Sequence, residues 1–179
     1  MKSTTTRYGT VAIALHWITA LAILVLFLSG MRSEGSATAA DKIGVLRVHA
    51  PLGISILVLT LLRILWWRMA DTKPALIGGM PRWQEISSHA VHGLLYLAML
   101  GMAGSGMALF LSSGAGDVVL WGGAGPLTEF DDYMLRTVHG AGAKLTLALI
   151  VVHAGAALWH QFGMKDGLLG RMWFGRGAA

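Results

Sequence analysis

Four long apolar stretches constrain the fold of this chain more than any other feature. They cover about residues 11–31, 46–67, 89–111 and 138–162. A helix needs about 20 apolar residues to cross the hydrocarbon core of a bilayer, and each stretch is long enough. The composition agrees, because 55% of the 179 residues are hydrophobic and 13% are charged, whereas ordinary soluble domains carry about 25% charged residues. The sequence therefore predicts an all-α integral membrane four-helix bundle that forms a single transmembrane domain over residues 1–179.

The distribution of Lys and Arg predicts how the bundle faces the membrane, because cytoplasmic loops carry an excess of these residues. The side with both termini and the second loop holds nine of them: Lys2, Arg7, Arg63, Arg68, Lys73, Arg82, Lys165, Arg171 and Arg176. The other side holds five: Arg32, Lys42, Arg47, Arg136 and Lys144. Four of the nine acidic residues lie in the third loop, on that second side: Asp117, Glu129, Asp131 and Asp132. We therefore expect both termini in the cytoplasm.

The composition also excludes several classes of function. The chain has no cysteine, which removes disulfides, thiolate metal sites and covalent attachment of c-type haem. Any haem must therefore be held non-covalently. The pI near 10 does not indicate a nucleic-acid partner, because the basic residues flank apolar runs and form no basic stripe. Membrane lipid is the expected partner.

Histidines within the apolar stretches are the candidate functional residues, because polar groups inside a membrane are costly and usually functional. Helix geometry places His139 and His153 about 40° apart around the fourth helix and about 21 Å apart along its axis. His16 lies early in the first helix, which enters from the cytoplasm, so we expect it at the depth of His153. His49 lies early in the second helix, which enters from the opposite side, so we expect it at the depth of His139.

Each matched pair could hold one flat macrocycle between two helices, as cofactors are held in helix bundles. The predicted ligands of two haem irons are His16 with His153 and His49 with His139. Ligation by two imidazoles leaves no open position on iron, so it favours electron transfer. Zinc or iron transport, or a proton relay, would usually also need carboxylates, and no Asp or Glu lies within the four stretches. For a single histidine, an interhelical hydrogen bond is the simpler interpretation.

The histidine segments resemble bacterial cytochrome b561, a small di-haem b-type cytochrome of the inner membrane. The resemblance rests on ALHW with His16, VHAPLGISILVLTLLR with His49, SHAVHGLLYL with His92, and the spacing of His139, His153 and His160. It implies that the four matched histidines are the haem ligands. It also implies a ubiquinone pocket near His92 and His160 beside the cytoplasmic haem. The best-understood type is a superoxide oxidase, which passes electrons from superoxide to ubiquinone.

Several assignments have more than one interpretation. His92 and His160 could protonate a quinone, or they could only hydrogen-bond interfacial water or a haem propionate. Arg63 could pair with a propionate of the cytoplasmic haem, or its side chain could extend to the membrane surface. Arg136 is a candidate contact for a propionate or for an incoming anion. Lys144, inside the fourth helix, has no assigned role.

Two functions remain open at this stage. One is an enzyme, a superoxide:ubiquinone oxidoreductase of the bacterial inner membrane. The other is a cytochrome b subunit that relays electrons between a dehydrogenase or hydrogenase partner and quinone. Short termini and compact loops favour the first, because a subunit should offer a larger docking surface. A haem-free transport or structural protein is a third class of function. We expect the purified protein to contain b-type haem, which would exclude this class.

Overall fold

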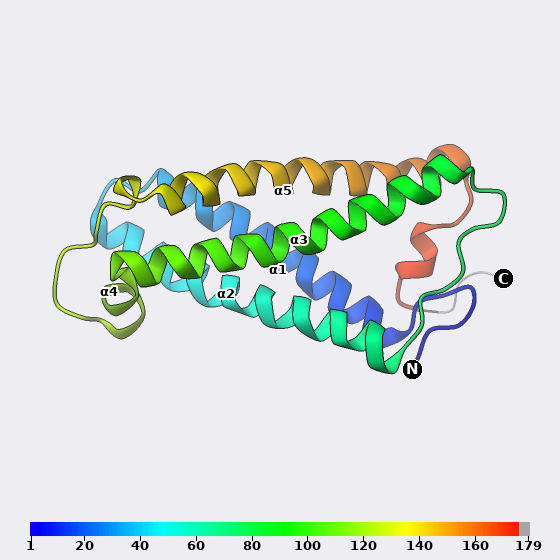
Figure 1. The fold of residues 1–179 in the computed structure, drawn as a ribbon, viewed down its shortest axis with the longest axis horizontal. Helices are drawn as coiled ribbons and strands as arrows, with labels where there is room; N and C mark the ends of the chain where they lie inside the picture. Colours follow the sequence, from blue (N-terminus) through cyan, green and yellow to red (C-terminus); the bar gives the residue numbers. More distant parts are fainter. Residues whose placement is uncertain (176–179) are drawn as a thin grey trace.

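A computed structural model describes residues 1–175 of the chain, and that range is all-helical (Figure 1). Its α-helices are α1 (Thr10–Glu34), α2 (Ala39–Leu65), α3 (Arg82–Ser113), α4 (Ala115–Trp121) and α5 (Met134–Leu158). Four helical segments are long and apolar enough to cross a membrane, which confirms the predicted fold class. The single domain over 1–179 stays a prediction, and Arg176 lies outside the described residues.

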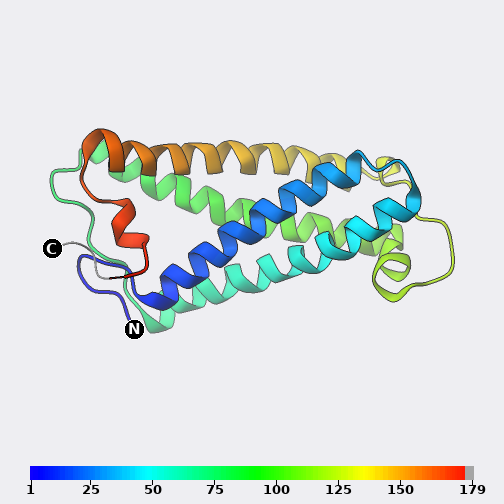
Figure 2. The same ribbon diagram turned by 180° about the vertical axis from the view of Figure 1, so that it is seen from behind.

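The four long helices run side by side, and the N-terminus and the last described residues, up to 175, lie at one end of the bundle (Figures 1 and 2). We call this end the termini end and the opposite end, which carries α4, the far end. Helix α1 packs on α2, α2 on α3, and α3 on α5. Helix α5 does not pack closely on α1 or on α2. The α5 backbone therefore stays apart from the α1 backbone and from the α2 backbone.

The helices extend beyond the apolar stretches at both ends of the bundle. Helix α3 begins at Arg82 because its polar first turns still favour helix, and Pro81 precedes it with an extended backbone. It ends at Gly114, whose φ of 69° is a left-handed conformation that glycine adopts at little cost. Helix α2 begins after Thr38, whose hydroxyl accepts a hydrogen bond from the Asp41 amide. Local capping therefore sets helix ends that hydropathy alone places several residues too far inward.

Two of the spanning helices end in π-helical turns at the termini end. Helix α2 continues into η1 (Trp66–Ala70), and α5 continues into η3 (Trp159–Met164). Two short 3₁₀ turns complete the fold: η2 (Phe130–Asp132) and η4 (Leu169–Met172). Because π turns are rare and often mark functional positions, they direct attention to this end.

Few side chains fill the space between the spanning helices. The packed apolar core lies at the far end, where α4 and η2 cover α2 and α3; its members are Leu46, Leu109, Ala115, Val119 and Phe130. In the most apolar part of the four spans, only 6% to 22% of the residues are buried. Protein interiors are normally close-packed. Most side chains of the spans therefore stay at least partly accessible, outside the packed core at the far end.

The N-terminal segment, the loop after α2 and the C-terminal segment are tied together at the termini end. The Asp71 carboxylate accepts hydrogen bonds from the Ser3 amide and from the Ser3 hydroxyl, the latter at 2.8 Å. Arg171 donates to the carbonyls of Thr6 and Ala75, each at 2.6 Å. Burial opposes ionisation of Asp71, but the hydrogen bonds from Ser3 and its other donors outweigh burial and lower its pKa below the ordinary value. These bonds fix the position of the C-terminal segment below the helix ends.

Candidate cofactor-binding sites

The structure brings His49 and His139 together at the far end. Their ring centres lie 6.3 Å apart with planes tilted by 71°. The two residues come from α2 and α5, whose backbones do not pack closely. Both rings are half-buried. The pair therefore spans a gap between helices, as the depth argument predicts.

Each far-end histidine also bonds a serine of the neighbouring helix. His49 Nδ1 lies 2.9 Å from the hydroxyl of Ser29 on α1. His139 Nδ1 lies 3.0 Å from the hydroxyl of Ser105 on α3. In both cases Nε2 forms no hydrogen bond to the protein within residues 1–175, so it is available to a ligand.

Three histidines meet at the termini end. The ring centres of His16 on α1 and His153 on α5 lie 6.1 Å apart, with planes tilted by 67°. The His92 ring on α3 lies 5.1 Å from the same His153 ring. His92 Nδ1 donates to the Ser88 carbonyl at 2.7 Å, so its Nε2 is available as an acceptor. The sequence argument matches His16 with His153, and the structure adds His92 beside them.

In each of the two histidine pairs, the rings have the spacing that a haem iron bound between them requires. A metal–imidazole bond is about 2.0–2.1 Å long and an imidazole radius is about 1.1 Å, so two rings on one iron have centres about 6 Å apart. The distances of 6.3 Å and 6.1 Å agree with this value. His92 is too close to His153 to share an iron with it on opposite faces. A Cβ atom added at Gly53 or Gly155 would meet no atom within 4 Å, which leaves space beside His49 and His153. The residues therefore fit two non-covalent haem groups.

A bare metal ion fits the described residues less well. Within residues 1–175, no set of three or more His, Asp or Glu side chains is arranged to hold an ion. Paired imidazoles on opposite faces of a macrocycle remain the better match.

The basic residues singled out in the sequence occupy three different settings. Arg63 Nε is buried and has no hydrogen-bond partner among residues 1–175, while the guanidinium lies 5.8 Å from the centre of the Tyr96 ring. Arg136 pairs with Glu34 and lies 3.9 Å from Asp131. Lys144 is exposed on α5. An unpaired buried donor is costly, so Arg63 is the one that fits a propionate best, whereas Arg136 already has carboxylate partners.

His160 lies in the π turn that follows α5 and is 8% exposed. Its Nδ1 lies 2.5 Å from Asp166 Oδ2, and Asp166 Oδ1 accepts from the Leu168 amide at 3.0 Å. Asp166 thus holds the orientation of the imidazole. The sequence interpretation missed this carboxylate, because it follows the helix across an irregular turn where no periodic spacing links it to His160.

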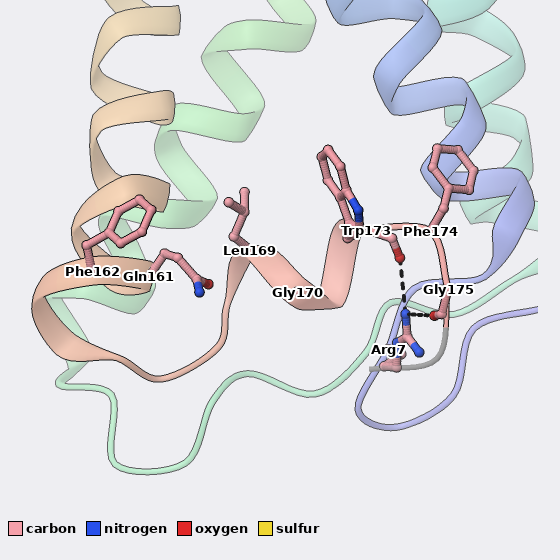
Figure 3. A pocket seen from close by; sticks show the side chains of 8 residues that line it. All are labelled: Arg7, Gln161, Phe162, Leu169, Gly170, Trp173, Phe174 and Gly175. Carbon is pink, nitrogen blue, oxygen red and sulfur yellow. Dashed lines mark hydrogen bonds between the residues drawn. The ribbon is translucent and has the colours of Figure 1, made fainter. Parts of the chain in front are cut away.

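A pocket of about 380 Å³ opens beside this turn (Figure 3). It lies between the end of α5, the C-terminal segment and Arg7, which donates to the Trp173 carbonyl at 3.1 Å. Gln161 lines it, and its buried Oε1 has no hydrogen-bond partner in the range 1–175. Neither His92 nor His160 lines the pocket, so the structure does not place the two predicted quinone residues in one cavity. The remaining lining is Phe162, Leu169, Gly170, Trp173, Phe174 and Gly175.

An all-helical membrane bundle with a pair of facing imidazoles near each end defines a membrane cytochrome b. A family model described as prokaryotic cytochrome b561 matches residues 7–175, and the chain belongs to that family. The chain is 30% identical over 174 residues to cytochrome b561 homolog 1 of Escherichia coli strain K12, covering 93% of this chain and 96% of the relative.

Two further relatives span nearly the whole chain. The probable superoxide oxidase CybB of Yersinia pestis is 27% identical over 170 residues, which cover 93% of this chain and 95% of the relative. Cytochrome b562 of Cereibacter sphaeroides is 31% identical over 179 aligned positions, which cover 92% of this chain and 94% of the relative. The similarity therefore includes all four spanning helices and the segments at both ends.

Proposed function

We propose that this cytochrome b is a superoxide:ubiquinone oxidoreductase of the bacterial inner membrane, with both termini in the cytoplasm. It binds two haem b groups, one between His49 and His139 and one between His16 and His153. Two superoxide anions each give up one electron and leave as dioxygen. One ubiquinone takes both electrons and two protons and becomes ubiquinol. When bound, the haem groups supply a route for single electrons across the membrane.

The observation that carries this proposal is the pair of imidazole–imidazole distances near 6 Å at opposite ends of one bundle. On α5 the two ligand positions are fourteen residues apart, or about 21 Å. The α5 backbone stays away from α1 and α2 where the histidines meet. A transmembrane electron carrier needs this arrangement, and a haem-free packing role would not.

Quinone reduction needs protons as well as electrons, and the termini end supplies groups that can carry them. His92 presents an available Nε2 beside the His16–His153 pair. His160 is held by Asp166, which orients the ring as a proton donor or acceptor. The pocket at Gln161 and Trp173 has a volume within the range of small-molecule sites. We assign the ubiquinone head group to the termini end, and proton transfer to His92 and His160, which lie at this end but outside the pocket.

A second candidate function is supported by the charge of the far end. Five cations there face six carboxylates, and Arg136 is neutralised by Glu34. This gives little electrostatic attraction for superoxide, although steering of an anion benefits from positive potential. A membrane subunit that receives electrons from a dehydrogenase or hydrogenase partner needs no such attraction. The two functions differ only in the electron donor.

The test uses purified protein in detergent with two haems per chain. Superoxide and a soluble ubiquinone analogue are added without any partner, and ubiquinol formation is followed. Turnover supports the oxidase, whereas haems that accept electrons from dithionite but not from superoxide support the relay function. His92→Gln and His160→Gln should lower quinol formation by about 10²–10⁴-fold while both haems stay bound. His89→Gln, on the exposed face of α3, is the matched control and should leave the rate unchanged.

A further inference from the structure

The far-end histidines are bonded in the same way from two different helices. The tripeptide Ser-Gly-Met occurs at Ser29-Gly30-Met31 in α1 and again at Ser105-Gly106-Met107 in α3. Ser29 bonds His49 on the adjoining helix α2, and Ser105 bonds His139 on the adjoining helix α5. The two serines therefore occupy equivalent positions in two helix hairpins.

The hydroxyl hydrogens decide the direction of these bonds. Ser29 donates its hydroxyl hydrogen to the Leu26 carbonyl at 3.1 Å. Ser105 donates in the same way to the Met102 carbonyl at 3.1 Å. A serine has one hydroxyl hydrogen, so each oxygen is left to accept from the histidine. Nδ1 is thus the protonated nitrogen in both rings, and Nε2 carries the lone pair that a metal requires.

A glycine follows each serine, and at Gly106 the missing side chain leaves room that the bonded ring needs. A Cβ atom at Gly106 would lie 3.1 Å from His139 Cε1, which is tighter than ordinary packing. A Cβ atom at Gly30 would lie 3.5 Å from His49 Cε1. The Ser-Gly step therefore supplies a hydrogen-bond acceptor and the space beside it.

The termini-end ligands lack this arrangement. Within residues 1–175, neither ring nitrogen of His16 or His153 forms a hydrogen bond to the protein, although both rings are as well placed for a haem as the far-end pair. The imidazoles of one proposed haem are thus anchored at Nδ1 and those of the other are not. The two sites differ in the environment of their ligands, not in the type of ligand.

We propose that Ser29 and Ser105 are positioning residues that fix the tautomer and orientation of His49 and His139 and lower the reduction potential of the far-end haem relative to the haem at the termini end. This inference rests on the proposed ligand assignment. A hydrogen bond from Nδ1–H to an acceptor makes Nε2 more basic. A more basic ligand stabilises ferric over ferrous iron. Electrons therefore pass from the far end to the termini end in the favourable direction.

The test measures haem content and reduction potential in Ser29→Ala, Ser105→Ala and the double variant. A spectroscopic redox titration should show two potentials, of which the lower one rises in each single variant and rises further in the double variant. The higher potential should stay unchanged. Far-end haem affinity should fall by about 10–100-fold, as for other residues that orient metal ligands. Ser112→Ala is the matched control, because Ser112 on α3 also donates to a backbone carbonyl but bonds no histidine.

Two further variants separate the possible failures. Ser29→Thr keeps the hydroxyl and should restore the wild-type potential; loss of the far-end haem in both Ser29→Ala and Ser29→Thr would overturn the inference. Unchanged potentials in the double variant would also overturn it. If His49→Ala still binds two haems, the ligand assignment itself is wrong. If His49→Ala binds one haem and the serine variants have wild-type potentials, only the role of the serines is wrong.

Discussion

The two ends of the bundle hold histidines in different surroundings. At the far end, His49 and His139 each have one serine partner, and the space around them is bounded by glycine. At the termini end, His16 and His153 have a third histidine beside them and Arg63, whose Nε is buried, in the same half of the bundle. The spacing of the paired rings is nearly the same at both ends.

This contrast suggests that the same spacing of paired histidines can be used for two different roles in the proposed function. At the far end, Nδ1 of each proposed ligand histidine already has a serine partner, and a packed core lies under α4. Such surroundings suit a site that only accepts and passes electrons. An imidazole with an available nitrogen, a His–Asp pair and a pocket suit a site where protons must also move. The spacing of the paired imidazoles is alike at the two ends, but the packing around them differs. We therefore expect any functional difference between the ends to come from the surroundings of the histidines.

The largest effect should come from removing the histidines themselves. His49→Ala and His139→Ala should each abolish the far-end haem, and His16→Ala and His153→Ala the other, because an iron that loses one of two axial ligands is poorly held. The haem-to-protein ratio should fall from two to one in every case. A pyridine haemochrome assay of the purified protein measures this ratio.

The same four variants also test the pairing. Redox titration should show that His49→Ala and His139→Ala lose the same potential, and that His16→Ala and His153→Ala lose the other one. His92→Ala should keep both haems, because its ring is too close to His153 to lie across one iron from it. If His49→Ala and His16→Ala lose the same potential, the division into two ends is wrong.

Arg63 gives the next largest effect, and only at the termini end. Its buried Nε has no partner in the described part of the chain, which fits a haem propionate as the missing acceptor. Arg63→Gln should lower the affinity for the termini-end haem by about 10–100-fold and leave the far-end haem bound. Haem retention during dilution and gel filtration measures the loss. Arg68→Gln, in the turn just beyond α2, is the control and should retain both haems.

Gly106 should show an effect confined to the far end. An added methyl group would lie 3.1 Å from the His139 ring, so Gly106→Ala should destabilise the protein by about 1–3 kcal/mol through overpacking. Gly30→Ala places its methyl group at an ordinary contact distance of 3.5 Å from His49 and should be neutral or slightly stabilising, since alanine favours helix. Thermal unfolding followed by haem absorption and circular dichroism compares the two. Equal destabilisation by both variants would mean that ring clearance is not the cause.

The sequence was sufficient to predict the fold class and the histidine pairing, because both follow from regular helix geometry. Apolar length predicts the four spanning helices, and 1.5 Å of rise per residue places His16 level with His153. The ligand roles of these residues stay predictions, as do the orientation in the membrane and the identity of donor and quinone. The depth argument did not give the direction in which each side chain points around its helix axis. It therefore could not show that the His92 ring also lies beside His153.

Other features depended on contacts that no periodic pattern reveals. The pairing of Ser29 with His49 joins two helices across a hairpin, and only the repeated Ser-Gly-Met tripeptide signals it in the sequence. Asp166 reaches His160 through an irregular turn. Arg136 was considered as an anion contact, but its neighbour in space is Glu34, 102 residues away in the chain. Each of these depends on tertiary packing, so the sequence alone left several partners possible.

The smallest expected effect comes from Asp71, whose carboxylate ties the N-terminal segment to the loop after α2. Burial opposes the charge, but hydrogen bonds from Ser3, Thr72 and Trp66 lower the pKa of Asp71 below its ordinary value of 3.8. A carboxylate with a depressed pKa contributes stability that is fully present above the unfolded pKa and is lost as the pH falls through the folded pKa. Asp71→Asn should therefore cost about 1 kcal/mol at pH 7, and the difference from wild type should vanish well below pH 3.8.

Thermal unfolding of the two proteins between pH 7 and acid pH measures this difference. Asp132→Asn is the control at the far end, because Asp132 is exposed and accepts no hydrogen bond from a side chain within residues 1–175. It should match wild type at pH 7. If Asp71→Asn and wild type unfold at the same temperature at pH 7, the bonds to Ser3 contribute nothing to the folded state. The bonds of Arg171 to the carbonyls of Thr6 and Ala75 do not involve Asp71, so they should remain in this variant.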